Sequence, residues 1–206
     1  MKNIKKIKGD ASFRKFYRKK SKNINSIIVL AKKEKFKNLI IYEAINRILN
    51  KNKILAPKLF KENYKKNYIE IQDFGDNTIF KILKRKNVNK ILYFKKIINL
   101  LCRIQLVKSR SITNFKNKTY HIPKYNGKIL INEANLFSKW YAEENLKSSK
   151  KKTFSKKFNK VIKELVSKLN LKNDVFVHRD FHVSNLMLIR DEIGVIDSQD
   201  ALIGNR

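Results

Sequence analysis

The chain has 206 residues, 42% of them hydrophobic and 11% aromatic, which is enough for one ordinary domain or for two small lobes. Its 13 Phe and 8 Tyr exclude wholesale disorder, even though 32% of the residues are charged. The formal net charge of +32 would attract any polyanion, but Lys is spread over the whole chain without a basic stripe that carries stacking aromatics. The composition therefore argues against a specific nucleic-acid partner.

The N-terminal segment is basic but lacks the apolar run that a signal peptide needs. No stretch of about 18 uninterrupted apolar residues, the length that spans a bilayer, occurs in the sequence. The single cysteine, Cys102, cannot form a disulfide framework, and its place in an apolar helical pattern predicts a small buried side chain rather than a catalytic thiol. These features predict a cytoplasmic protein without a membrane partner.

The first third of the chain predicts a small β-rich lobe, residues 1–73. Short apolar runs within residues 5–20 and at residues 26–31 alternate with polar turns, which is typical of three short strands. Residues 38–54 carry apolar side chains at the spacing of one helix face. Residues 56–73 then read as a strand, a polar turn and a second strand. The predicted order is strand, strand, strand, helix, strand, strand.

After this lobe the pattern changes to helices, and residues 74–78 form the predicted hinge. Apolar side chains repeat at helical intervals in four further segments, residues 78–86, 88–108, 132–146 and 153–169. Residues 109–128 predict a loop, with Pro123 and Gly127 as breakers. The expected fold class is α+β, a small antiparallel β lobe followed by a mostly helical lobe at residues 79–206, and two lobes around a hinge form a cleft.

The residues that carry chemistry lie near the end of the chain. His178, Asp180 and Asn185 follow the pattern H-x-D-x-x-x-x-N between two apolar runs, and Asp197 ends a third run. Because Mg²⁺ prefers hard oxygen ligands, Asn185 and Asp197 suit a magnesium site, and Asp180 is left to accept the proton of an attacking hydroxyl. Each residue alone also suits a loop-stabilising hydrogen bond. Their joint spacing favours phosphoryl transfer from ATP.

Four segments together resemble the superfamily of aminoglycoside phosphotransferases and choline kinases, and more narrowly the bacterial anomeric kinases of N-acetylmuramate and N-acetylglucosamine. The segments are GDASFRKFYR, YIEIQDFGDNTIFKIL, NEANLFSKWYAEENL, and VFVHRDFHVSNLML with GVIDSQDALIG, in family order over nearly the whole chain. The resemblance implies a protein-kinase-like two-lobe fold, ATP and Mg²⁺ as cofactors, and transfer to a hydroxyl of a small molecule. The expected acceptor is an amino sugar of cell-wall recycling.

The resemblance places the segment GDASFR over the nucleotide phosphates. There Gly9 allows close backbone approach, the Ser12 hydroxyl binds phosphate oxygens and Arg14 adds positive charge. The same residues also suit an ordinary hairpin turn with exposed basic side chains.

Related kinases often pair a lysine of the third strand with a glutamate of the following helix. Here Lys32 or Lys33 is the candidate lysine and Glu43 the candidate partner, with a surface ion pair as the alternative. In the helical lobe, Trp140 and Tyr141 are expected to pack in the core rather than to line a sugar site. His182 is expected to form structural hydrogen bonds rather than to transfer protons.

The chain departs from the family pattern at two places. Ser198 stands where the family has an aromatic residue, so we expect the loop of Asp197 to lose a packing anchor. The family continues after D-A-x-x-G with a Pro-containing turn and further helices, whereas this sequence reads ALIGNR. The expected helical lobe is therefore incomplete at its C-terminus, and a truncated, non-catalytic nucleotide-binding remnant is the alternative to a kinase. A basic nucleic-acid-binding protein is the weaker alternative, and the sequence does not indicate an oligomeric state.

Overall fold

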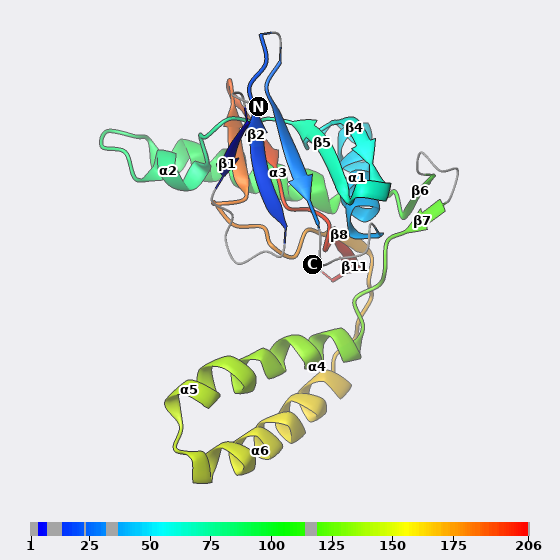
Figure 1. Ribbon diagram of the computed structural model, residues 1–206. Coiled ribbons are helices and arrows are strands. Elements are labelled where there is room, and N and C mark those ends of the chain that lie inside the picture. Colours follow the sequence, from blue (N-terminus) through cyan, green and yellow to red (C-terminus); the bar gives the residue numbers. More distant parts are fainter. Residues whose placement is uncertain (1–3, 8–13, 23, 32–36, 114–118, 206) are drawn as a thin grey trace. The chain divides into compact units, whose positions relative to one another are not determined.

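The computed structural model describes residues 4–7, 14–22, 24–31, 37–113 and 119–205 (Figure 1). The chain forms two compact units. The first contains Met1–Ile122 and Phe176–Leu202, and the second contains Pro123–Val175 and Ile203–Arg206. The predicted hinge at residues 74–78 lies inside the first unit, and the division into lobes at this hinge stays a prediction.

The first unit is built on a five-stranded antiparallel sheet in the order β1-β2-β3-β5-β4. Its elements, in chain order, are β1 (Ile4–Ile7), β2 (Lys15–Lys19), β3 (Ser26–Leu30), α1 (Lys37–Lys51), β4 (Leu59–Asn63), the 3-10 turn η1 (Tyr64–Lys66) and β5 (Tyr68–Gln72). The predicted order of strands and helix in this part of the chain is confirmed.

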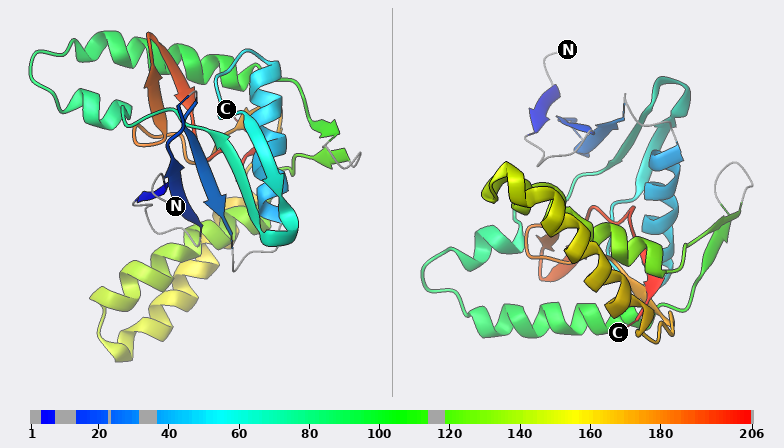
Figure 2. Two further views of the ribbon diagram at one scale, coloured as in Figure 1. Left: turned by 45° about the horizontal axis from the view of Figure 1, so that its top comes forward. Right: turned by 90° about the horizontal axis from the view of Figure 1, so that it is seen from below.

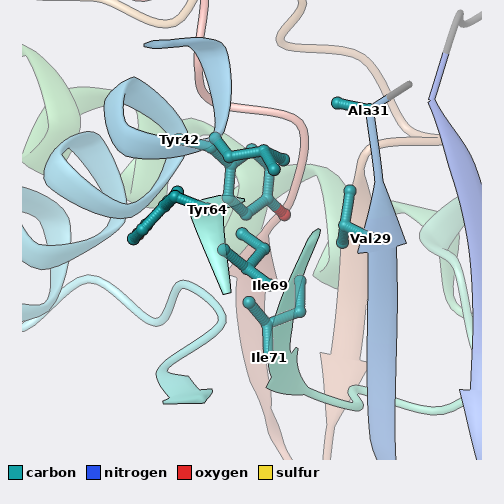
Figure 3. Packing of buried hydrophobic residues seen from close by; sticks show 7 residues of the cluster. Val29, Ala31, Tyr42, Tyr64, Ile69 and Ile71 are labelled. Atoms are coloured by element: carbon teal, nitrogen blue, oxygen red, sulfur yellow. The ribbon is translucent and has the colours of Figure 1, made fainter. Parts of the chain in front are cut away.

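One face of the sheet packs on α1. Alternate residues of β5, Ile69 and Ile71, are buried, as period-2 burial requires of a strand with one covered face. They form one cluster with residues of β3, of the position directly after it, of α1 and of η1, namely Val29, Ala31, Leu39, Tyr42 and Tyr64 (Figure 3). Each fully buried large apolar side chain stabilises such a core by about 1.5–3 kcal/mol. This packing fixes α1 against the sheet.

The first unit contains further elements, and two of them, β8 and β11, include residues on both sides of its chain boundaries at Phe176 and Leu202. Their bounds are α2 (Ile79–Leu83), α3 (Lys90–Gln105), β6 (Ser111–Thr113), β7 (Thr119–His121), β8 (Val175–Val177), β9 (Leu186–Ile189), β10 (Glu192–Val195) and β11 (Leu202–Gly204). The predicted helices at residues 78–86 and 88–108 are confirmed. Strands are found at the apolar runs on either side of the His178–Asn185 loop. Cys102 is exposed on α3, so the prediction that it is buried was wrong.

The predicted loop at residues 109–128 is wrong in part, because it contains the antiparallel pair β6 and β7 and the start of α4. In β6 the middle residue, Ile112, is buried while its two neighbours are exposed, which is the alternation of a half-buried strand. Gly127 does not break a helix but begins one, since the preceding Asn126 caps α4 by accepting a hydrogen bond from the Ile129 amide.

The second unit is a helical hairpin in which α4 and α6 lie side by side in every view (Figures 1 and 2). It consists of α4 (Gly127–Leu136), the π-helical turn η2 (Phe137–Ala142), α5 (Glu143–Asn145) and α6 (Ser148–Ser167). Phe137 joins the two arms through aromatic contacts with Phe158, at 5.4 Å between ring centroids, and with Phe154. The two helices predicted at residues 132–146 and 153–169 are confirmed, and each begins five residues earlier.

Trp140 and Tyr141 are not in the core of this unit, contrary to expectation. Their exposed fractions are 62% and 59%. The prediction assumed uninterrupted α-helical spacing, whereas the π-helical turn inserts extra rotation after Leu136 and moves the following side chains off the packed face. The alternative, that these aromatic side chains line a sugar site, stays a hypothesis. None of the described helices is long and apolar enough to cross a membrane.

Candidate nucleotide and metal site

A pocket of about 460 Å³ lies within the first unit. Its walls come from the sheet, from the linker after β5 (residues 73–78), from the end of the loop between β8 and β9, and from the residues after β10. Apolar side chains such as Phe16 and Ile27 line the sheet side, while Asn185 and Asp197 line the opposite segments. A mostly apolar pocket of this size with a few convergent polar groups is typical of small-molecule and cofactor sites.

The loop between β8 and β9 is folded onto itself by hydrogen bonds. The Asn185 amide nitrogen Nδ2 donates to the Asp180 carbonyl at 3.1 Å and lies 3.2 Å from the His182 ring nitrogen Nε2. Two backbone hydrogen bonds, from the His182 amide to the Asp180 carbonyl and from the Asn185 amide to the His182 carbonyl, tighten the turn. His182 thus has the structural contact expected of it, and the carboxamide oxygen of Asn185 is the atom left for a cation.

The two predicted metal ligands come together because a backbone hydrogen bond joins their segments. The Ile196 amide donates to the Asn185 carbonyl at 3.0 Å, and the Val195 amide donates to the Leu55 carbonyl at 2.8 Å. Asp197 follows directly, with a backbone φ of 61°. Its carboxylate is partly exposed and lies 3.8 Å from the Arg14 guanidinium, whose side chain is buried.

Asp180, the predicted base, is exposed and is not among the residues that line the pocket. His178, two residues earlier, is buried and packs edge-on against the Phe181 ring. Burial lowers the pKa of His178, and the nearby carboxylates of Asp180 and Asp197 partly oppose this shift. The neutral imidazole therefore serves as a packed support beneath the loop.

The other predicted residues are placed as follows. Gly9, Ser12 and Lys32 lie outside the described residues, as does Lys33, so Arg14 is the described member of the predicted phosphate segment. Glu43 is buried on α1, where its carboxylate accepts a hydrogen bond from Arg47 at 2.8 Å. Burial raises the pKa of Glu43, and the Arg47 guanidinium opposes the shift. The pairing of Glu43 with a lysine of the third strand stays a prediction.

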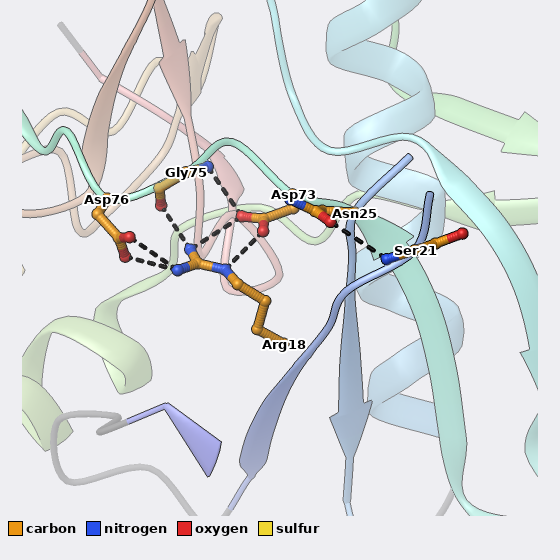
Figure 4. A network of polar contacts seen from close by, with 6 residues as sticks. All are labelled: Arg18, Ser21, Asn25, Asp73, Gly75 and Asp76. Atoms are coloured by element: carbon orange, nitrogen blue, oxygen red, sulfur yellow. Dashed lines mark hydrogen bonds and ion pairs between the residues drawn. The ribbon is translucent and has the colours of Figure 1, made fainter. Parts of the chain in front are cut away.

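Arg18, which no sequence pattern singled out, binds the linker after β5 (Figure 4). Arg18 of β2 binds the Asp73 carboxylate with two hydrogen bonds, of 2.6 and 3.0 Å, and donates to Asp76 at 2.8 and 2.9 Å and to the Gly75 carbonyl at 3.0 Å. This guanidinium also lowers the pKa of Asp76. The signal in the sequence was the pair of acidic residues around Gly75, Asp73 and Asp76, which favours a cation nearby in the fold.

Ser198 is fully buried, and its hydroxyl donates to the Asn46 side chain of α1 at 2.5 Å. The expectation that serine leaves the Asp197 loop without an anchor is therefore wrong. A hydrogen bond to α1 takes the place of aromatic packing, which the sequence could not show because the two residues are 152 positions apart.

The phosphotransferase enzyme family model matches residues 3–206. Among curated relatives, the chain is 24% identical over 200 residues to the N-acetylmuramate/N-acetylglucosamine kinase of Neisseria meningitidis serogroup B, which covers 95% of this chain and 56% of the relative. It is 25% identical over 195 residues to the enzyme of the same name from Pseudomonas aeruginosa, with 95% and 54% covered. The chain thus spans about half the length of the curated relatives it matches.

Solved structures of aminoglycoside phosphotransferases share the fold. APH(4)-Ia in a ternary complex with AMP-PNP and hygromycin B matches with a TM-score of 0.64 and 9% identity, over 98% of this chain and 68% of that one. The streptomycin–ATP–APH(2")-IIa ternary complex matches with a TM-score of 0.63 and 11% identity, over 100% and 69%. The predicted kinase-like fold with an antiparallel β lobe and a helical part is confirmed. By the match over residues 3–206, the chain belongs to the phosphotransferase enzyme family.

Proposed function

We propose that the chain binds ATP and Mg²⁺ and transfers phosphate to a hydroxyl of a small molecule, an amino sugar such as N-acetylmuramate or N-acetylglucosamine. The observation that carries the proposal is the convergence of Asn185 and Asp197 on one pocket wall, held by the hydrogen bond between Ile196 and Asn185. The choice of acceptor rests on the names of the curated relatives, which the chain matches over about half their length.

The residues on this wall fit Mg²⁺. The side-chain nitrogen of Asn185 is hydrogen-bonded within the loop, so its side-chain oxygen is the atom available to a metal ion. Asp197 supplies a carboxylate. The described residues contain no cluster of three or more His, Cys, Asp or Glu that would close around a metal. That suits Mg²⁺, which typically keeps waters and binds about one or two carboxylates together with substrate phosphates. When bound, the ion would offset the negative charge of the triphosphate.

Arg14 and Asp180 complete the proposed chemistry. Arg14 lies beside Asp197 and would contribute positive charge next to the phosphates. Asp180 would accept the proton of the acceptor hydroxyl while the hydroxyl oxygen bonds to the γ-phosphorus and the bond from that phosphorus to the β,γ-bridging oxygen breaks. Its exposed position outside the pocket lining suits a base that meets an acceptor rather than the nucleotide.

The test is ATP-dependent phosphorylation of N-acetylmuramate and N-acetylglucosamine by the purified chain, in Mg²⁺ and in EDTA. Asp180→Asn should lower kcat by about 100-fold or more, the scale of general-base catalysis. Asp191→Asn, an exposed aspartate in the turn between β9 and β10, is the control and should keep activity. Thermal stabilisation by Mg-ATP without turnover would assign the chain to a non-catalytic nucleotide-binding module. If Mg-ATP gives no thermal stabilisation and no turnover is observed, the proposed function is refuted.

A further inference from the structure

Two side chains of α1 reach the segment that carries Asp197. Tyr42 and Asn46 are one helical turn apart, so they lie on the same face of the helix, and both are buried. The Ser198 hydroxyl donates to Asn46 Oδ1 at 2.5 Å, and the Tyr42 hydroxyl interacts with the Asn46 side chain and with the backbone of Asp197. Burial raises the pKa of Tyr42 to about 12, so its hydroxyl stays neutral at physiological pH. Helix α1 is thus bonded to the metal-site segment.

The orientation of the Asn46 side chain is fixed by its two partners. Its Nδ2 donates to the Pro57 carbonyl at 3.1 Å, an atom that only accepts, so Oδ1 must face Ser198. One turn later on the same helix, Asn50 donates to the Ala56 carbonyl at 2.9 Å. Asn46 therefore joins α1, the segment before β4 and the segment after β10, and each of its two polar atoms has a buried partner.

The backbone of Asp197 needs such support. A φ of 61° lies in the left-handed region, which costs a residue with a side chain about 1 kcal/mol or more unless the surroundings hold it. On one side, the Ile196 amide is bonded to the Asn185 carbonyl. On the other side, the Ser198 side chain is bonded to Asn46, and its carbonyl accepts from the Ala201 amide at 3.1 Å. The residues before and after Asp197 are both fixed.

We infer that Asn46 and Ser198 are a positioning pair for Asp197. The buried hydrogen bond between them holds the Asp197 backbone so that the carboxylate lies on the pocket wall beside Asn185. Neither Asn46 nor Ser198 lines the pocket, so both act through Asp197 and not by contact with a ligand. This inference rests on the proposed function, because it assigns the pair to the magnesium-dependent part of ATP binding.

The test is the dissociation constant of ATP, measured by isothermal titration calorimetry on the 206-residue chain in Mg²⁺ and in EDTA. Ser198→Ala removes the donor and leaves Asn46 Oδ1 without it. We define the magnesium ratio as the dissociation constant in EDTA divided by that in Mg²⁺. We expect this ratio to fall by about tenfold or more, as for other residues that orient metal ligands, while the affinity in EDTA is unchanged. Ser198→Cys, which exchanges the hydroxyl for a larger thiol that is a weaker donor, should show a smaller loss and decides the question if Ser198→Ala does not fold.

Ser26→Ala is the matched control. Ser26 is also buried, and its hydroxyl donates to a carboxylate of Glu70 at 2.6 Å, but the pair lies on the sheet and does not line the pocket. It should lower stability while keeping the magnesium ratio of the wild type. An unchanged magnesium ratio in the Ser198 variants, or an equal loss of this ratio in Ser26→Ala, would overturn the inference and leave the proposed function standing. Absence of magnesium-dependent ATP binding in the wild type would overturn the proposed function and the inference together.

Discussion

At the scale of single residues, two polar links, one part-buried and one buried, join segments that contribute to the pocket, and both connect positions far apart in the chain. Arg18 reaches 55 residues to Asp73, and Ser198 reaches 152 residues to Asn46. The residue types were visible in the sequence, but the partners were not, because such pairs depend on strand register and on helix packing. By contrast, Asn185 and Asp197 were predicted to converge because each follows an apolar run, and the structure brings both to the same pocket.

Arg18→Met should lower the free energy of unfolding by about 2–4 kcal/mol, because it leaves the buried carboxylate of Asp73 without its bidentate partner. Arg18→Lys should recover only part of the loss, since an ammonium cannot reproduce the fork of hydrogen bonds to Asp73, Asp76 and Gly75. Urea denaturation at neutral pH measures both.

Lys168→Met is the control for this experiment. Lys168 pairs with Glu164 on the surface of the second unit, where both side chains are more than half exposed. Exposed pairs of this kind contribute about 0–1 kcal/mol. Equal effects of Arg18→Met and Lys168→Met would contradict the role given to Arg18 in fixing the linker.

At the scale of elements, hydrophobic periodicity predicted the order of strands and helices well, because elements such as β5 and α3 bury residues at the spacing of one face. It failed where the period changes or the element is very short. The π-helical turn at Phe137–Ala142 rotates Trp140 outward, and the three-residue strands β6 and β7 are too short to give a clear alternation. Helix N-caps were also difficult to predict, since Asn126 next to Gly127 is equally typical of a turn and of a helix start.

Helix α6 offers a test at this scale. Its N-cap residue, Lys147, has the extended backbone of a cap but makes no side-chain capping hydrogen bond. Lys147→Asp should raise the free energy of unfolding by about 0.5–2 kcal/mol, because aspartate accepts from the first free amides and its charge suits the helix N-terminus. Thermal or urea denaturation measures the change. Lys147→Ala, which removes the charge without adding an acceptor, should give no such gain, and equal gains in both variants would contradict the capping explanation.

At the scale of the whole molecule, the described parts of the proposed site lie in one compact unit. Arg14, Glu43, Asp180, Asn185 and Asp197 all belong to the first unit, as does every residue that lines the pocket. The proposed nucleotide site therefore depends on contacts within this unit. The net charge of +32 adds a general attraction for ATP that weakens with salt and does not depend on Asp197.

Whether Asp197 holds the metal is decided by the affinity for ATP at one fixed ionic strength, in Mg²⁺ and in EDTA, for the wild type, Asp197→Asn and Asp191→Asn. We expect tighter binding of ATP in Mg²⁺ than in EDTA for the wild type and for Asp191→Asn, and loss of that difference in Asp197→Asn. Because Asp191→Asn removes the same charge outside the pocket, it controls for the general attraction. If Asp197→Asn keeps the full magnesium dependence of the wild type, Asp197 is not a ligand of the metal and the assignment of this pocket is contradicted.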